Sequence, residues 1–421
     1  MTRRIFLSSL AAATAVRAVA RPARAPSGAG PAARITRISL VPIQGRFHKF
    51  VAMNSYDTAP KGHTYTNHLI RIATDAGAEG VGAMGYAAPD DAYRAALKGL
   101  IGADPLAIFT MQDGKVAGQA PAFASLLTKY PHLDGPLLDL LGKFVSKPVW
   151  KLLGEAVRDR VEVYDGTLYF SDVWFKDRGV RAVIEEAEEA VKSGFLGLKF
   201  KVGRGWKWMP PAAGLERDIE VLIEARKAAG PDVKILADAN DGYRNDFEGA
   251  WRLMRETKGA NLFWMEEIFP EDINRYAELR RRMAEEGIRT HIADGENLRE
   301  PEAFKPYLKP PRAFDAVQMD IRVGGMLANR ELARMAGAAG AFSVPHNWAS
   351  EIGKYMGLHL AKAIKEVTAA EDDRSTCDVI RAEGYEFRQG CYTVSDSPGL
   401  GLSINADIYK EKYAPSETVI T

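Results

Sequence analysis

From Val161 onward the chain alternates short apolar runs with charged amphipathic stretches, and this alternation constrains the fold more than any other feature. Apolar runs such as VEVYDG, GLKFKVG, VKILADAN and NLFWMEE are separated by stretches such as VRAVIEEAEEAVKSG and LERDIEVLIEARKAAG. A strand followed by a helix, repeated about seven times, indicates parallel strands joined by helical crossovers. About eight such strands over roughly 210 residues favour a closed α/β barrel over an open sheet.

The same pattern divides the 421-residue chain into four parts. Residues 1–33 form a leader, and residues 34–157 mix predicted strands and helices, which indicates an α+β capping domain. Residues 158–372 carry the barrel, and the turn-rich residues 373–421 are expected to return to the cap. The net charge of +1 and the lack of a long basic run in the body give no indication of a nucleic-acid partner. A small, polar or anionic ligand fits this composition.

The leader resembles an export signal. It carries Arg3 and Arg4 in TRRIFL, followed by an apolar stretch from Ile5 to Val16 that is too short to span a membrane. This arrangement is similar to the twin-arginine signal, so we expect a periplasmic protein, with cleavage after Ala25 or Ala20. The alternative is a disordered leader rich in alanine and arginine.

Two cysteines, Cys377 and Cys391, are present. An oxidising compartment would permit a disulfide between them, and two free thiols are the alternative. No cysteine-based metal site can be built from two thiols.

Charged and polar side chains gather at the ends of successive predicted strands. One charged residue at a strand end usually meets solvent, but a run of them on neighbouring strands indicates a site, because barrel chemistry collects at the carboxyl ends of the strands. The residues are Lys199, Lys201, Asp238, Asn240, Glu266, Glu267, Asp294, Glu296, Asp320, His346 and Glu371.

Three of the acids predict a metal centre. Asp238, Glu266 and Glu296 follow three consecutive strands, so their carboxylates can converge at the barrel mouth. Gathered carboxylates repel one another unless a cation neutralises them, and hard oxygen ligands suit Mg²⁺, with Mn²⁺ as the alternative. The two-residue period of a strand places Asn240 beside Asp238 and Asp294 beside Glu296, as supporting groups.

Proton-transfer groups flank these acids in the chain. Lys199 and Lys201 precede them on one strand face, while Asp320 and His346 follow them. A carboxylate that accepts a hydrogen bond from an imidazole orients the ring, so Asp320 and His346 form one station and Lys201 the other. Two bases beside a cation that binds a carboxylate indicate removal of the proton α to that carboxylate.

The ordered motifs LKFKVG, ILADAN, WMEEIFP, ADGEN, MDIRVGG and VPHNW resemble the enolase superfamily, within it the mandelate racemase subgroup. The resemblance covers most of the chain after the leader. It implies a (β/α)₇β barrel with an α+β cap, Mg²⁺ bound by the three acids, and Lys201 with His346 as the acid/base pair. Asp320 would be the partner of His346.

The same resemblance implies roles for two further residues. Glu371 would donate a hydrogen bond to the enediolate oxygen and would therefore be protonated, with Glu366 as a rival for this position. Lys199 would contact the substrate carboxylate and lower the pKa of Lys201. Among the metal ligands, Glu267 remains the rival of Glu266.

Substrate contacts are expected from the cap and from two departures from the family pattern. The polar cap loop supplies His48 and Lys49, and Arg322 either binds an anionic substrate or lies on the surface. The segment RGWKWMPPAAG after Lys201 looks long and is expected to fold over the site.

The resemblance favours a dehydratase of sugar acids, which needs a base for the α-proton and an acid for the β-hydroxyl. A racemase or epimerase of a 2-hydroxy acid is the alternative. A periplasmic sugar-acid binder without turnover is a third hypothesis, and the paired bases argue against it. We expect a small-molecule carboxylate as substrate and a homo-oligomeric protein.

Overall fold

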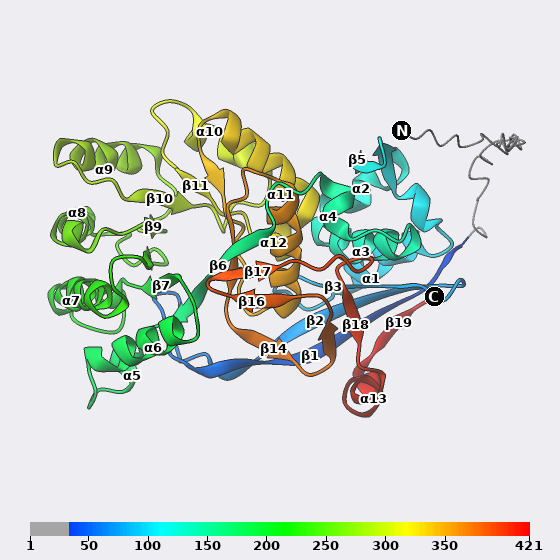
Figure 1. Ribbon diagram of the computed structural model, residues 1–421, viewed down its shortest axis with the longest axis horizontal. Helices are drawn as coiled ribbons and strands as arrows, with labels where there is room; N and C mark the ends of the chain where they lie inside the picture. The colour runs from blue at the N-terminus through cyan, green and yellow to red at the C-terminus, as the bar shows by residue number, and fades with distance from the viewer. Residues whose placement is uncertain (1–32) are drawn as a thin grey trace, which may run out of the picture. The chain divides into compact units, whose positions relative to one another are not determined.

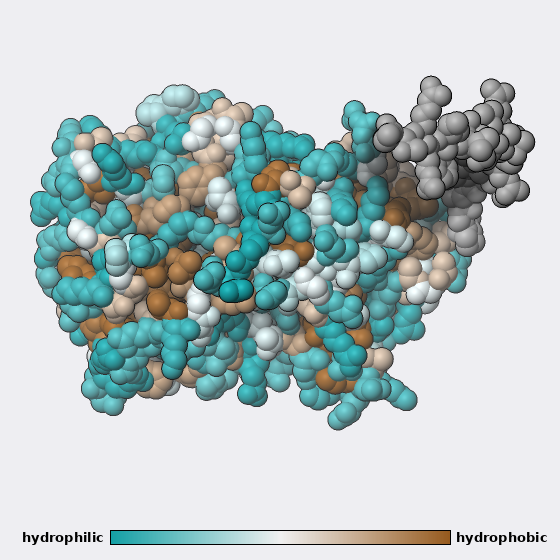
Figure 2. All heavy atoms as spheres, viewed as in Figure 1, coloured by the Kyte–Doolittle hydropathy of each residue, from teal (hydrophilic) through white to brown (hydrophobic). Residues whose placement is uncertain are grey.

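A computed structural model describes residues 33–421, which form one compact unit. The predicted leader lies outside the described residues. Within them, no helix is both long and apolar enough to cross a membrane. Figure 2 shows hydrophilic side chains over most of the visible face, with apolar ones in small groups between them.

The cap is built on an antiparallel sheet whose first strand is long. β1 (Ile35–Val51) pairs with β2 (Gly62–Thr74), which pairs with β3 (Glu79–Ala83). The C-terminal segment returns to this sheet, because β14 (Ser375–Cys377) and β19 (Thr418–Ile420) both pair with β1. Apolar residues alternate along β1 and fill the cap core, as expected for a sheet with one buried face.

Helices cover the buried face of this sheet. α3 packs directly on β3, where a Cβ at Gly80 would come within 2.1 Å of the Pro136 carbonyl oxygen, so glycine is required there. A hairpin, β4 (Phe109–Gln112) and β5 (Lys115–Gln119), completes the cap. The cap helices are α1 (Asp91–Leu97), α2 (Pro121–Lys129), α3 (Asp134–Phe144) and α4 (Val149–Leu153).

The predicted barrel is confirmed. Eight strands run parallel in the order β12-β11-β10-β9-β8-β7-β6, with β13 beside β6 and a bridge between Ser343 and Val367 on the β12 side. The strands are β6 (Arg160–Leu168), β7 (Gly197–Lys201), β8 (Lys234–Asp238), β9 (Trp264–Glu266), β10 (His291–Asp294), β11 (Ala316–Val317), β12 (Phe342–Ser343) and β13 (Ala369–Asp372).

Helical crossovers join the strands, which gives the (β/α)₇β order expected from the alternation. In Figure 1 the helices α6 to α9 form an outer layer beside β7 to β10. The crossover helices are α5 (Ser171–Trp174), α6 (Val180–Lys192), α7 (Pro211–Ala229), α8 (Phe247–Glu256), α9 (Ile273–Glu285), α10 (Lys305–Leu308), α11 (Ile321–Ala338) and α12 (Glu351–Ala363).

Beyond the barrel, β17 pairs with the start of β6 and with β16, and β15 pairs with β18. Both cysteines are free, so the disulfide alternative is wrong: Cys377 lies on β14 in the cap sheet and Cys391 on β17 at the barrel. The remaining elements are β15 (Ile380–Ala382), β16 (Glu386–Arg388), β17 (Cys391–Thr393), β18 (Leu402–Ile404) and α13 (Ala406–Ile408).

Candidate active site

The strand register brings the predicted site residues side by side at the carboxyl end of the barrel. Lys201 pairs with Asp238 across β7 and β8, and Asp238 pairs with Glu266 across β8 and β9. Glu296 follows β10 by two residues, and its side chain is mostly buried. Because neighbouring parallel strands end at the same edge, these groups share one mouth.

Lys199 and Lys201 both contact carboxylates, so neighbouring negative charges compensate their positive charges. The Lys199 ammonium is 2.9 Å from Glu266 Oε1, 2.7 Å from Glu371 Oε1 and 3.4 Å from Asp238 Oδ2. Lys201 donates a hydrogen bond to Asp238. Both lysines are almost fully buried, so each charge needs these partners to offset the loss of hydration.

Lys199 lowers the pKa of Lys201, as expected, but it does not set the direction of the overall shift. Burial is the largest effect and lowers the pKa of the Lys201 ammonium, and Lys199 also lowers it. Asp238, Glu266 and Glu296 together outweigh both, so the pKa is raised overall. The adjacent acids likewise hold the pKa of Lys199 well above its usual value, against the effect of burial. With only the protein's own side chains around them, Lys199 and Lys201 are therefore both positively charged.

Glu371 reaches the same cluster from β13, whereas Glu366 precedes that strand and lies 3.7 Å from Lys365. Burial opposes ionisation of Glu371, yet Lys199 and then His346 hold its pKa below the usual value. The backbone N–H of Asn347 also donates to Glu371 Oε2 at 2.9 Å. As the side chains stand, this carboxyl is ionised, because an ammonium lies 2.7 Å away. Its protonation while it donates to an enediolate oxygen stays a prediction.

His346 and Asp320 form the predicted pair, with Nδ1 of the imidazole 2.6 Å from Asp320 Oδ2. The fold places Asp320 as the N-cap of α11, where its Oδ1 accepts from the backbone N–H groups of Arg322 and Val323. Tyr86 of the cap donates to Oδ2 at 2.7 Å. Burial lowers the pKa of His346, but Glu296 and Asp320 raise it to about 10.

The three predicted metal ligands are buried acids with opposite pKa shifts. Burial raises the pKa of Asp238, but Lys201 and Lys199 reverse this and hold it at about 2. Burial and then Asp238 raise the pKa of Glu266 to about 8, and burial raises that of Glu296. A raised pKa is expected where buried carboxylates are crowded together without enough positive charge, as at Glu266 and Glu296.

Two oxygens in this cluster lack a hydrogen bond: Glu266 Oε2 and Glu296 Oε2. Glu296 Oε2 lies 3.2 Å from His346 Nε2, close enough for an ion pair, but without the alignment of a hydrogen bond. As the side chains stand, no group of three or more His, Cys, Asp or Glu residues within 33–421 is arranged to hold a metal ion. Lys199 and Lys201 instead contact one oxygen of Asp238, and Lys199 contacts one oxygen of Glu266. The donor set itself, buried carboxylate oxygens with two unsatisfied, fits Mg²⁺.

The predicted supporting groups have well-defined partners. Asn240 donates its backbone N–H to Asp238 and its side-chain amide to Glu267, and it accepts from Asn54 of the cap at 2.8 Å. Glu267 also accepts from Tyr56 and Asn297, so this rival ligand already has three hydrogen-bond donors. Asp294 accepts from the Tyr276 hydroxyl of α9.

A cavity of about 200 Å³ opens beside these groups and joins the cap to the barrel. Its size suits a small ligand, since pockets for drug-sized molecules span about 300–1,000 Å³. Its lining residues are Asn54, Tyr56, Lys61, Tyr86, Tyr169, Lys201, Asn240, Glu296, Asn297, Arg299, Asp320, His346, Trp348 and Glu371.

Three residues expected to contact substrate do not line this cavity. Lys49 bonds to Glu186 and to the Thr167 carbonyl, and His48 lies 3.8 Å from Glu189, so both are directed at α6. Arg322 is buried and donates to Asn67, to the Met84 carbonyl and to the Trp348 carbonyl. It is neither a surface residue nor a cavity residue; it ties the cap to the barrel.

The long segment after Lys201 does not line the cavity either. The Trp208 indole donates to the Asn54 carbonyl at 2.8 Å, and Lys207 donates to the Tyr56 carbonyl at 2.9 Å. Arg204 anchors the segment through buried ion pairs to Asp172 and Asp218. The segment therefore supports the cap loop that carries Asn54 and Tyr56.

Comparison with known proteins places the chain among enzymes. Residues 182–408 match the enolase C-terminal domain-like family. The arabinonate dehydratase of Saccharolobus solfataricus is 32% identical over 284 residues, which cover 66% of this chain and 70% of the relative. The D-galactarolactone cycloisomerase of Agrobacterium fabrum is 29% identical over 82% of this chain and 91% of its own.

Solved structures of enzymes superpose on this chain over most of its length. A mutant of a galacturonate dehydratase from Geobacillus sp., complexed with Mg, superposes with a TM-score of 0.80 at 27% identity, over 94% of this chain and 99% of its own. A racemase from Streptomyces coelicolor has a TM-score of 0.71 at 21% identity, which shows the shared fold. By its strand order, its matched family and its relatives, the chain belongs to the enolase superfamily.

Proposed function

We propose that this protein is a Mg²⁺-dependent lyase that dehydrates a sugar acid to a 2-keto-3-deoxy acid. The observation that carries the proposal is that Lys201 and the His346–Asp320 pair line one cavity from different sides of the acid cluster. A binding protein needs no such pair of proton-transfer groups. The matched dehydratases support the same reaction class.

Dehydration uses both groups in turn. One of Lys201 and His346, in its neutral form, takes the proton from the carbon α to the substrate carboxylate. The other, in its protonated form, delivers a proton to the β-hydroxyl as the C–O bond breaks. Water leaves, and the resulting enol becomes the ketone. Asp320 fixes the orientation of the imidazole by accepting from Nδ1 at 2.6 Å, and Tyr86 holds Asp320 in turn.

Asp238, Glu266 and Glu296 would hold the cation through carboxylate oxygens. When bound, the cation supplies positive charge beside the substrate carboxylate, which makes the neighbouring C–H more acidic. Lys199 lies within 3.4 Å of Asp238, Glu266 and Glu371, so it keeps these acids together and adds a second positive charge to the site.

A panel of sugar acids incubated with Mg²⁺ tests this function. We expect one or more acids to give a 2-keto-3-deoxy product, detected by mass spectrometry as the loss of one water. Inversion at the α-carbon without a keto product would assign a racemase instead. Binding of an acid without any turnover would assign a binding protein.

We also propose export to the periplasm, supported by the paired arginines in TRRIFL and the short apolar stretch after them. Replacing both residues (Arg3→Lys with Arg4→Lys) is expected to retain most of the protein in the cytoplasm. Fractionation of cells that produce the natural and the substituted chains measures this. Equal periplasmic amounts of the two chains would contradict the proposal.

A further inference from the structure

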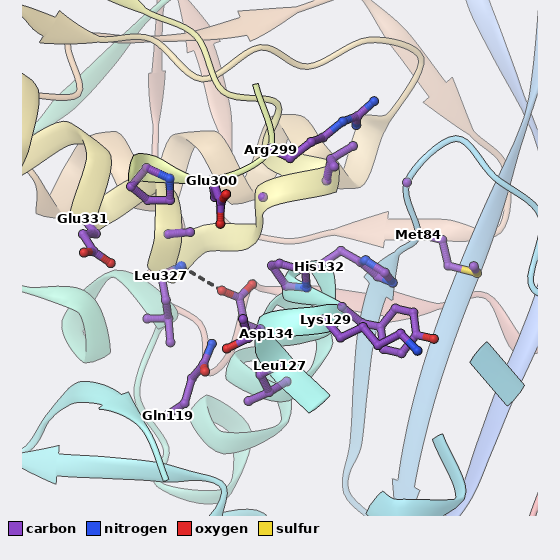
Figure 3. A pocket seen from close by; sticks show the side chains of 18 of the residues that line it. Met84, Gln119, Leu127, Lys129, His132, Asp134, Arg299, Glu300, Leu327 and Glu331 are labelled. Atoms are coloured by element: carbon purple, nitrogen blue, oxygen red, sulfur yellow. Dashed lines mark hydrogen bonds between the residues drawn. The ribbon is translucent and has the colours of Figure 1, made fainter. Parts of the chain in front are cut away.

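Arg299 lines two cavities. It follows β10 and precedes a short 3₁₀ helix, Pro301–Phe304, and it lines the catalytic cavity together with Tyr86. The same two residues line a second, larger cavity of about 1190 Å³ between the cap and the barrel, shown in Figure 3. Arg299 is therefore placed to meet the end of a substrate that extends out of the catalytic cavity.

The other cations of the catalytic cavity already have partners. Lys201 bonds to Asp238, and His346 lies between Asp320 and Glu296. Lys61, at the mouth, is 2.7 Å from Asp57. Positive charge that is already neutralised contributes little to binding a further anion.

Arg299 differs from all of these. It is exposed, and within residues 33–421 its guanidinium makes no hydrogen bond or ion pair. Figure 3 shows its side chain directed away from the carboxylate of its neighbour Glu300. The next acid along the chain, Glu302, forms an ion pair with Lys305, with 2.5 Å between its Oε2 and the Lys305 Nζ. All of the guanidinium donors of Arg299 remain available to a ligand, and their planar fork matches a carboxylate.

We infer that Arg299 binds a second, distal carboxylate of the substrate, so that the site selects dicarboxylic sugar acids over monocarboxylic ones. This inference rests on the proposed function, in which the first carboxylate lies at the acid cluster. Charge-assisted hydrogen bonds are about twice as strong as neutral ones, so loss of this contact should cost about tenfold in affinity.

Equilibrium binding tests the inference separately from turnover. The dissociation constants of a six-carbon aldaric acid and of the aldonic acid with the same configuration are measured by calorimetry in the His346→Asn background, with Mg²⁺ present. We expect the diacid to bind about tenfold more tightly or better. Adding Arg299→Gln should bring the ratio of the two constants to about twofold or less, and Arg299→Lys should restore part of it.

Arg334→Gln is the matched control, because Arg334 is an exposed arginine that lines the larger cavity but not the catalytic one. It should leave the ratio within about twofold, since long-range effects of exposed charges are screened by salt. An unchanged ratio in Arg299→Gln overturns the inference, whatever happens to the absolute affinities. If both acids bind but neither turns over in the natural protein, the proposed function fails while the ratio still decides the role of Arg299.

Discussion

His346→Asn is expected to lower the rate of dehydration by about 10²–10⁴-fold, the range that a general acid or base contributes. Asparagine can keep a hydrogen bond to Asp320 but cannot exchange a proton at neutral pH. The imidazole is buried, with Asp320 at 2.6 Å, so no other residue replaces it at this position. Steady-state formation of the keto product measures the loss.

His291→Asn is the matched control. His291 begins β10 at the opposite end of the barrel and is partly exposed, 3.9 Å from Asp315. It should retain activity within about twofold, as expected for a surface substitution. Full activity in His346→Asn would show that the proton-transfer group has been misassigned. Deuterium exchange at the α-carbon in the same variant assigns the role of the imidazole: exchange that persists without elimination makes it the acid.

Glu266→Gln is expected to weaken Mg²⁺ binding by about 100-fold or more, since even outer-shell changes at metal sites cost about 10–100-fold. Glu266 Oε2 is buried without a hydrogen bond. The Gln side chain would replace this negatively charged metal ligand by a neutral amide. Titration with Mg²⁺, followed by calorimetry, measures the dissociation constant.

Glu267→Gln supplies the comparison at the adjacent position. Glu267 accepts from Tyr56, Asn240 and Asn297, so its substitution should disturb the cap loop more than the cation. We expect a smaller loss of Mg²⁺ affinity than in Glu266→Gln. If the order is reversed, Glu267 is the ligand, and the assignment of the acid cluster to these strands is wrong by one residue.

The barrel could be predicted because its pattern is periodic. Each apolar run ends at the mouth, so residues such as Lys201, Asp238 and Glu266 could be placed at neighbouring strand ends from their spacing alone. The pairing of Asp320 with His346 followed from the same reasoning. For Lys201, Asp238 and Glu266 the geometry agrees because β-sheet register leaves little freedom within the strands. Asp320 and His346 lie just beyond β11 and β12.

The cap contribution to the site could not be predicted in this way. Asn54 and Tyr86 lie in loops without periodicity, and their contacts to Asn240 and Asp320 bridge more than 180 positions in the chain. The polar character of His48 and Lys49 predicts contact with the substrate, but both residues lie on β1 and pair with glutamates of α6. Composition alone does not tell which polar loop residues face a cavity.

The charge states also depended on distances that the sequence does not contain. The spacing of Lys199 and Lys201 predicts mutual repulsion, but each ammonium contacts a carboxylate that offsets this repulsion. For the same reason Glu371 is ionised beside Lys199. Coulomb energies change steeply over a few ångströms in a buried site, so side-chain contacts decide the sign of a pKa shift.

In the proposed reaction this site removes the proton α to a carboxylate. Proton NMR in D₂O, with Mg²⁺ and a panel of aldonic and aldaric acids, tests it most directly, because exchange is seen whether elimination or inversion follows. We expect loss of the α-proton signal for at least one acid, and we expect this exchange to be abolished or strongly slowed when Lys201 and His346 are both replaced. Tight binding of an acid whose α-proton never exchanges would contradict it.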